Sequence, residues 1–360
     1  GISCRLCGPR LRLLTSDGEV VRTEDPISYV AKLINEGNIV AIKGVGGYHI
    51  AALATDDDVV LKLRERKRRP TQPFAVMALD VDVASKLVFI DGNAREVLTS
   101  PQRPIVLLPK QPESPVSRYV SPGLDKEGVF LPYTALHYLL LMDTRDKFLI
   151  MTSGNVHDQP MCTDVNCVLR KLGKVVDYVL DHDLRIAHRV DDSVVRFTGG
   201  ELVIIRRSRG YAPMWVRLPI KLRRPAIAFG ADLQMAGAVG VSDKVVLTQY
   251  IGDLDYVETL EDLDRELRWF MKTYRIKDPI LVCDANPAYR STWLCHRWAE
   301  EFSADIVSVY HHHAHALSVA ADWGEAGPFV SVAIDGVGYG VDGMSWGGEV
   351  LIIDGAKFSR

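Results

Sequence analysis

Four histidines fall within five residues near the end of the chain, in the stretch VYHHHAHALS. His311 and His315 are four residues apart, and the apolar run DIVSV before them predicts a strand that leads into a helix. On the first turns of that helix both imidazoles can point to one side and share a metal ion. His312 and His313 would point elsewhere. A polar helix start exposed to solvent is the alternative, and the density of histidine favours the metal.

A carboxylate is the expected third ligand. Asp335, in the stretch VAIDGVGYGVDG, is predicted to end the next strand, at the carboxyl edge where α/β sheets bind ligands. Gly336 and Gly338 follow it, and such glycines can leave backbone N–H groups free to approach phosphate oxygens. A loop that needs positive φ would use the same glycines.

A basic run, KLRERKRRPTQP, lies in the first third of the chain. It ends at Pro70, where a helix must stop, so Lys67 and Arg69 are expected at a helix-to-strand corner that can hold a triphosphate or a small anion. Two other readings are a solvated helix face and a nucleic-acid surface.

Two further polar clusters follow predicted strands. The stretch TSGN, residues 152–155, offers hydroxyl and amide groups, and RRSRGYAP adds Arg206 and Arg209. Three polar clusters at strand ends predict one cleft for an anionic nucleotide. Tyr48 and His49 either line this cleft or pack beneath it.

The cysteines raise a separate question. Cys4 and Cys7 have the C-x-x-C spacing of two zinc ligands, which is half of a closed four-ligand site, so the pair is either chance or the end of a longer module. Six cysteines without a disulfide pattern favour a reducing compartment, and the cytoplasm is expected. The other four cysteines are expected to be small buried residues: Cys162, Cys167, Cys283 and Cys295.

Composition predicts an ordinary mixed α/β protein. The chain has 360 residues, of which 47% are hydrophobic and 25% charged, and its net charge is -3. It is long enough for two or more cores. No window approaches eighteen consecutive apolar residues, and nothing points to a membrane or to secretion.

Helical and strand patterns alternate along two blocks. In DPISYVAKLINEG, Asp25 is the expected N-cap, Pro26 the first helical residue and Gly37 the C-cap, and the strand NIVAIKG follows. A hairpin is expected at Gly199 and Gly200. The basic, proline-containing stretch near residues 218–225 predicts a domain boundary.

Together these motifs resemble the HypF family of carbamoyltransferases, which act in nickel–iron hydrogenase maturation. KGVGGYHIA, LRERKRRPTQPFAVM, MTSGN, RVDDSVVR and RRSRGYAP are similar to its YrdC-like domain. GADLQMAG, VCDANPAYRST, VYHHHAHALS and AIDGVGYGVDGMSWGGE are similar to its carbamoyltransferase domain, of the actin-like ATPase (ASKHA) class. The family's zinc-finger-like module ends in C-x-x-C-G-P-R, as residues 4–10 do.

The resemblance implies an internal segment with three parts. Residues 1–14 would end the zinc-finger-like module, 15–217 would form the YrdC-like twisted mixed sheet, and 218–360 would form the N-terminal half of the actin-like α/β domain. The missing zinc ligands would lie upstream, after an acylphosphatase domain, and the last domain would continue beyond the final residue.

The resemblance also implies a reaction sequence. Carbamoyl phosphate is hydrolysed to carbamate, and the YrdC-like domain condenses carbamate with ATP to carbamoyl-adenylate and pyrophosphate. The last domain transfers the carbamoyl group to the C-terminal cysteine of HypE, the partner protein, for the cyanide ligands of the hydrogenase iron.

Roles for individual residues come with the resemblance. Lys67 and Arg69 match a Lys-x-Arg pattern that would bind the ATP phosphates, and Ser153 and Asn155 match a Ser-x-Asn element; these four are the expected catalytic residues. The expected nucleotide contacts are completed by a set of polar and glycine residues: Lys43, Thr152, Ser193, Arg206, Arg209, Gly336 and Gly338.

The implied cofactors are ATP with magnesium and two metal sites. Cys4 and Cys7 would bind zinc, and His311, His315 and Asp335 would bind a divalent metal, iron or zinc.

Three alternatives stay open. A threonylcarbamoyl-adenylate synthase for tRNA modification shares the YrdC-like fold, and antibiotic O-carbamoyltransferases share both domain types. A nucleic-acid-binding zinc module is the rival of another class, but the net acidic charge and the single basic cluster argue against a broad phosphate-binding face.

Overall fold

The computed structural model describes residues 8–156 and 159–360. Contacts divide the chain into two compact units, Gly1–Tyr211 and Ala212–Arg360. Strand β12 (Trp215–Arg217) pairs antiparallel with β15 (Lys244–Leu247) and so belongs to the second unit. The domain limits expected from the sequence stay a prediction.

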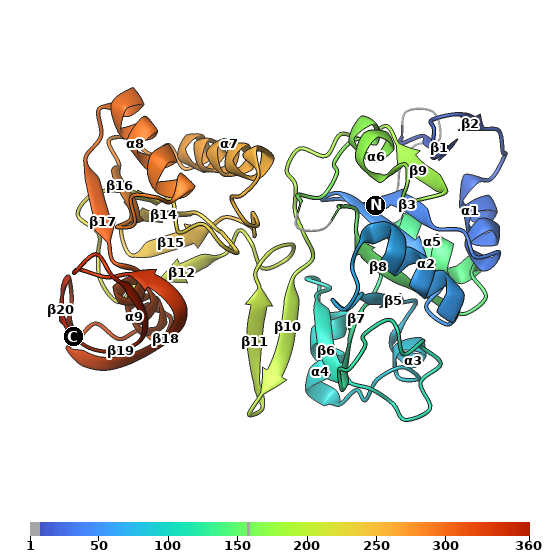
Figure 1. The fold of residues 1–360 in the computed structure, drawn as a ribbon, viewed down its shortest axis with the longest axis horizontal. Coiled ribbons are helices and arrows are strands. Elements are labelled where there is room, and N and C mark those ends of the chain that lie inside the picture. Colours follow the sequence, from blue (N-terminus) through green and yellow to red (C-terminus); the bar gives the residue numbers. More distant parts are fainter. Residues whose placement is uncertain (1–7, 157–158) are drawn as a thin grey trace. The chain divides into compact units, whose positions relative to one another are not determined.

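The described part of the first unit contains one mixed sheet, in the strand order β11-β10-β6-β7-β5-β8-β4-β3-β9-β1-β2 (Figure 1). Its strands are β1 Leu11–Thr15, β2 Val20–Val21, β3 Val40–Lys43, β4 Tyr48–Ala52, β5 Val76–Ala78, β6 Ile105–Pro109, β7 Lys126–Phe130, β8 Phe148–Ser153, β9 Tyr178–His182, β10 Val194–Thr198 and β11 Glu201–Arg206. Every residue of β3 and β4 is buried, as expected for central strands covered on both faces.

Six helices accompany this sheet in the described residues: α1 Pro26–Asn35, α2 Asp57–Lys67, α3 Val81–Ala84, α4 Gly92–Thr99, α5 Ala135–Asp143 and α6 Val165–Leu172. The Asp25 carboxylate accepts hydrogen bonds from the backbone N–H groups of Ile27 and Ser28, which confirms the predicted N-cap of α1. Glu36 is the C-cap, and the predicted Gly37 follows it with φ +87°.

Helix α2 ends where the basic run predicted a corner. Its C-cap, Arg68, has a left-handed backbone (φ 52°), which turns the chain two residues before Pro70. Lys67 is therefore the last helical residue and Arg69 lies just beyond the cap. The hairpin between β10 and β11 turns at Gly199 and Gly200, both at positive φ, as predicted.

The second unit contains two sheets within the described residues, one in the order β12-β15-β14-β13-β16-β17 and one in the order β18-β19-β20. The remaining strands are β13 Ala226–Ala228, β14 Ala238–Val241, β16 Ile280–Asp284, β17 Ile306–Val309, β18 Phe329–Tyr339, β19 Ser345–Asp354 and β20 Lys357–Ser359. The helices are α7 Val257–Thr273, α8 Arg290–Phe302 and α9 His311–Asp322.

Strands β13, β16 and β17 are parallel, so their carboxyl ends meet at one edge of the sheet. Asp284 is the last residue of β16, and His311 begins the helix that follows β17. The predicted strand-to-helix transition before the histidines is therefore confirmed. We expected Asp335 to end its strand, and this prediction was wrong. Strand β18 continues to Tyr339, and its register with β19 shifts between Ile334 and Gly338.

No helix in residues 8–156 or 159–360 combines the length and the apolar character needed to cross a membrane.

Candidate nucleotide and metal sites

Lys67 lies at the centre of the polar cluster in the first unit. Its side chain is almost fully buried (1% exposed), and Nζ donates hydrogen bonds to the backbone oxygen of Ser153 (2.5 Å), to the backbone oxygen of Asn155 (2.8 Å) and to Oδ1 of Asn155 (2.8 Å). The Ser153 hydroxyl donates to the same Oδ1 (2.8 Å). Helix α2 and the end of β8, far apart in sequence, therefore meet as the resemblance implied.

Arg69 reaches the same strand end. Nη1 donates to the hydroxyl of Thr152 (3.3 Å), Nη2 donates to the backbone oxygen of Pro73 (3.0 Å), and the guanidinium lies over the Phe74 ring, 5.4 Å from its centre. Burial first, and then the charge of Arg69, hold the pKa of Lys67 well below its ordinary value. The desolvated Lys67 thus lies beside the partly exposed Arg69, and an added anion would relieve the repulsion between the two cations.

His49 adjoins this cluster, although sequence reasoning left its role open. Strands β4 and β8 pair with His49 directly opposite Ser153, so the two side chains share a face of the sheet. Nε2 of His49 lies 2.7 Å from Oδ2 of Asp192. The register of the two strands links the Lys67 cluster to Asp192.

Arg209 is held inside the protein. Its guanidinium donates to Oδ1 of Asp192 (2.8 Å and 3.1 Å) and to the backbone oxygens of Gln102 and Arg103 (2.8 Å each), and it stacks on Tyr133 at 3.6 Å. These bonds give Arg209 a positioning role toward Asp192. A direct contact with phosphate stays a prediction.

The other predicted nucleotide contacts are distributed more widely. Lys43 is buried and donates to the backbone oxygen of His182 (2.7 Å), with Asp181 3.2 Å away. Ser193 is fully buried, and its hydroxyl donates to the backbone oxygen of Arg209 (2.9 Å). Arg206 ends β11 and is half-buried. Their role in binding a nucleotide stays a prediction.

The three predicted metal ligands of the second unit lie together. The Nε2 atoms of His311 and His315 are 3.2 Å apart, Nε2 of His311 is 3.3 Å from Oδ2 of Asp335, and one ligand atom from each residue fits within 4.8 Å of the others. Oδ2 of Asp335 is buried and has no hydrogen-bond partner among the described residues. Two imidazoles and a carboxylate suit zinc or iron, so these residues fit a divalent metal.

Asp284 completes this site and was missed in the sequence. Its Oδ2 lies 2.8 Å from Nδ1 of His311, and this hydrogen bond raises the pKa of His311. The bond fixes the ring so that Nε2 faces His315 and Asp335, which is the usual carboxylate–histidine arrangement behind a metal. A carboxylate at the end of the neighbouring parallel strand was the available signal.

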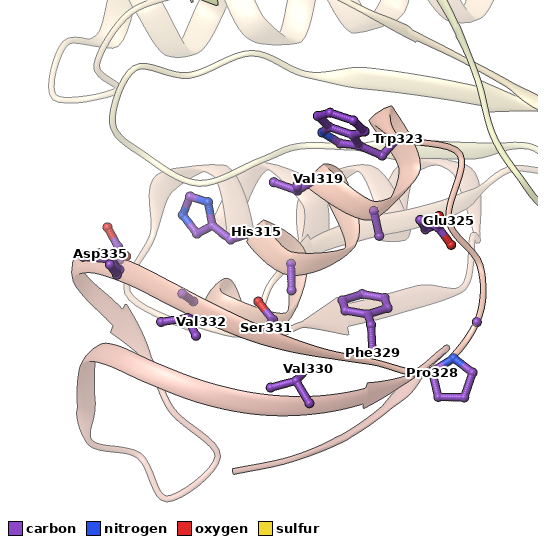
Figure 2. A pocket seen from close by; sticks show the side chains of 15 residues that line it. His315, Val319, Trp323, Glu325, Pro328, Phe329, Val330, Ser331, Val332 and Asp335 are labelled. Carbon is purple, nitrogen blue, oxygen red and sulfur yellow. The ribbon is translucent and has the colours of Figure 1, made fainter. Parts of the chain in front are cut away.

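A groove of about 560 Å³ extends from the metal ligands between α9 and β18. Figure 2 shows His315 and Asp335 near one end and Phe329 and Pro328 further along it. Trp323, which is 80% exposed, also lines it. The groove is therefore open, largely apolar, and polar at the end where the candidate ligands lie.

The glycines after Asp335 have at least one packing role. A side-chain carbon built on Gly338 would lie 2.6 Å from Cε1 of His312, so this residue must be small to let β18 approach α9. No such contact exists at Gly336. His312 and His313 are buried, and their Nε2 atoms lie 2.9 Å and 3.0 Å from backbone oxygens. His313 bonds outside the cluster, as expected, whereas His312 borders it, with Nε2 3.8 Å from Oδ2 of Asp335.

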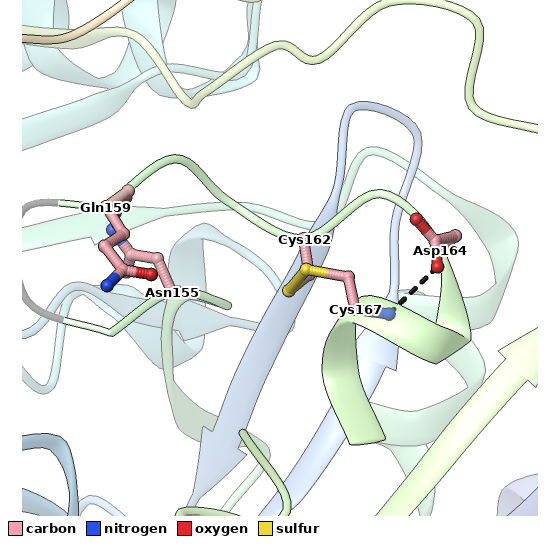
Figure 3. The surroundings of a disulfide bond; sticks show 5 residues. All are labelled: Asn155, Gln159, Cys162, Asp164 and Cys167. Carbon is pink, nitrogen blue, oxygen red and sulfur yellow. Dashed lines mark hydrogen bonds between the residues drawn. A yellow bond between two sulfur atoms is a disulfide. The ribbon is translucent and has the colours of Figure 1, made fainter. Parts of the chain in front are cut away.

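The cysteines correct one prediction. Cys162 and Cys167 form a disulfide beside Asn155 and Gln159, whereas we expected unpaired buried residues (Figure 3). The carboxylate of Asp164, which lies between the two cysteines in sequence, caps α6 by accepting from the backbone N–H of Cys167 (2.9 Å). Cys283 and Cys295 are free and buried, as expected. Cys4 and Cys7 lie outside the described residues.

Family models match most of the chain. Residues 32–208 match the Sua5/YciO/YrdC model, described as "Telomere recombination". Residues 221–322 match the HypF Kae1-like domain, and residues 331–360 match the second subdomain of the carbamoyltransferase Kae1-like domain. The crystal structure of full-length HypF in its phosphate- and nucleotide-bound form superposes with a TM-score of 0.91 at 36% identity, over 100% of this chain and 46% of that one. The chain belongs to the HypF family.

Individual HypF proteins align across the same range. The probable carbamoyltransferase HypF of Methanocaldococcus jannaschii is 41% identical over 97% of this chain and 46% of its own length. The carbamoyltransferase HypF of Synechocystis is 35% identical over 98% of this chain and 45% of its own length. The chain thus spans about half the length of the HypF relatives it matches. The predicted fold class, a YrdC-like mixed-sheet domain followed by a second α/β domain of the HypF type, is confirmed, and the family models describe the second domain as Kae1-like.

Proposed function

We propose that the first unit condenses carbamate with ATP to carbamoyl-adenylate and pyrophosphate. One observation carries this proposal: Lys67 is buried at the end of α2, beside Arg69, and bonded to Ser153 and Asn155 at the end of β8. A buried lysine beside a partly exposed arginine at the carboxyl end of a strand is suited to a polyphosphate. The nucleotide in the related HypF crystal structure supports ATP as the ligand.

The adenylation reaction requires stabilisation of negative charge more than it requires proton transfer. A carbamate oxygen attacks the α-phosphorus, the bond from that phosphorus to the bridging oxygen breaks, and pyrophosphate leaves. Negative charge grows on the phosphoryl oxygens during this step, and Lys67 and Arg69 would stabilise it. Ser153 and Asn155 would hold Lys67 in place and bind the nucleotide, with magnesium on the phosphates.

For the second unit we propose transfer of the carbamoyl group to the C-terminal cysteine of HypE. The acceptor thiolate attacks the carbamoyl carbon and AMP leaves. His311, His315 and Asp335 would hold a zinc or iron ion, which when bound polarises a carbonyl or orients a phosphate. Asp284 would keep His311 oriented. We also propose that the carbamate used by the first unit is produced by hydrolysis of carbamoyl phosphate.

Exchange of labelled pyrophosphate into ATP tests the first half of this proposal. With ammonium bicarbonate as the source of carbamate, we expect exchange by this chain and a loss of about 100-fold or more in Lys67→Met, because the variant lacks a charge at the phosphates. Lys62→Met, in the same helix and partly exposed, is the matched control. Equal rates in Lys67→Met and the control would refute the role of Lys67.

A further inference from the structure

His49 is a buried titratable residue that the proposed mechanism does not use. It is 3% exposed and lies on β4 directly opposite Ser153 of β8, so its ring shares a face with the serine whose hydroxyl joins the Lys67 cluster. A histidine placed there is adjacent to the expected position of the reacting carboxylate.

The partner of His49 determines which ring nitrogen carries a proton. Nε2 lies 2.7 Å from Oδ2 of Asp192, and Arg209 donates two hydrogen bonds to the other carboxylate oxygen. Burial raises the pKa of Asp192, but the opposing effects of His49 and Arg209 are larger in sum and leave it below its ordinary value. The ionised carboxylate can only accept, so Nε2 donates, and in the neutral ring Nδ1 is an acceptor.

This acceptor has no partner of its own. Nδ1 of His49 is buried and has no hydrogen-bond partner in the part of the chain that the structure describes. A buried acceptor of this kind usually binds water or a ligand. Its position beside Ser153 favours a ligand of the adenylation site.

Other polar atoms lie near Nδ1 of His49, around Gly44. A side-chain carbon built on Gly44 would lie 3.4 Å from Nδ1 of His49, 3.4 Å from the hydroxyl oxygen of Tyr133 and 3.0 Å from the backbone oxygen of Gly47. Because Gly44 has no side chain, these three atoms lie close around the position that a side-chain carbon would take. The Gly47 oxygen also accepts a hydrogen bond from the backbone N–H of Gly44 (2.8 Å). Nδ1 of His49 is the acceptor of this group that has no hydrogen-bond partner among the described residues, which suits a group with an N–H donor.

The walls around this point are largely apolar. The ring centres of Phe130, Tyr133 and His137 lie 6.5, 6.3 and 5.7 Å from that of His49. Burial is the main cause that lowers the pKa of His137 to about 3, so that ring stays neutral. Hydrogen bonds are stronger in apolar surroundings. A site of this kind therefore favours a substrate with a matching N–H donor over an analogue that lacks it.

We propose that His49 binds the amino group of the carboxylate substrate. Nδ1 would accept a hydrogen bond from the N–H of a small amino-bearing carboxylate, of which carbamate is the smallest, while its carboxylate faces Ser153 and Lys67. This inference rests on the proposed adenylation and adds the residue that selects the substrate. No proton moves, so His49 acts through binding, and Asp192 and Arg209 are positioning residues.

Substitution by glutamine tests the proposal. In His49→Gln the amide can still reach Asp192 as Nε2 does, but no acceptor remains at the position of Nδ1. In the pyrophosphate-exchange assay we expect the KM for carbamate to rise about 10-fold or more and the KM for ATP to stay within twofold. His296→Gln, an exposed histidine of α8, is the matched control.

The outcomes separate the two proposals. If wild type exchanges and His49→Gln keeps its KM for carbamate, or raises both KM values equally, the role of His49 is refuted and adenylation stands. If wild type exchanges with no carboxylate, both proposals fall. If the variant does not fold, ¹⁵N-histidine spectra of wild type decide: addition of carbamate with a non-hydrolysable ATP analogue should shift the unprotonated nitrogen of His49, and an unmoved resonance refutes the proposal.

Discussion

Buried charge at single residues is the most informative feature of the first unit. Lys67 was expected at a corner near a phosphate because the basic run stops at Pro70. The sequence did not reveal its burial, because the partners Ser153 and Asn155 lie 86 and 88 residues away and meet it only through the sheet. Residue type and local spacing predict chemistry well, whereas burial depends on contacts between distant segments.

Glu127 gives a prediction at the same scale. Its side chain is buried on β7, Oε1 has no hydrogen-bond partner among the described residues, and Ser121 donates to Oε2 (2.7 Å). Burial raises the pKa of Glu127 from 4.5 to about 7, although Ser121 opposes the shift. Between these two values the folded state holds a proton that the unfolded state has lost, so stability falls as pH rises.

Glu127→Gln should remove this pH dependence. At pH 5 the two proteins should be similar, and by pH 8 the variant should gain up to about 3 kcal/mol in free energy of unfolding relative to wild type. Urea unfolding at both pH values measures the difference. A difference between variant and wild type that does not change with pH would contradict the account.

At the scale of elements, caps and strand order explain which parts were predictable. The N-cap at Asp25, the helix after DIVSV and the hairpin at Gly199 each depend on a few neighbouring residues, and all three were predicted correctly. The length of β18 was not, because its continuation past Asp335 depends on pairing with β19. The Cys162–Cys167 disulfide was missed because spacing alone did not indicate the turn that α6 makes after its cap.

The geometry of the candidate metal site leads to a prediction about Asp284, the last residue of β16. Because the Asp284 carboxylate orients His311, Asp284→Asn should weaken binding of Co²⁺ or Zn²⁺ by about 10- to 100-fold, while Asp335→Asn, which alters a ligand, should weaken it more. Cobalt absorption titrations measure both affinities. Asp322→Asn, exposed at the end of α9, is the control. Unchanged affinity in Asp335→Asn would show that the cluster is not the metal site.

At the scale of the whole molecule, each of the two units holds one of the two candidate sites. The Lys67 cluster lies wholly within Gly1–Tyr211, and the metal ligands lie wholly within Ala212–Arg360. The first unit matches the Sua5/YciO/YrdC model and the second matches the HypF Kae1-like model, in the order in which the motifs predicted the two domains. The substrate does not follow from the motifs, because a threonylcarbamoyl-adenylate synthase stays an open alternative for the same YrdC-like motifs.

One measurement tests the central claim, that this chain adenylates carbamate. Pyrophosphate exchange into ATP would be followed with ammonium bicarbonate and, in parallel, with bicarbonate and threonine. We predict exchange that requires ammonium and does not respond to threonine. Exchange that requires threonine would contradict the account and indicate threonylcarbamoyl-adenylate synthesis instead.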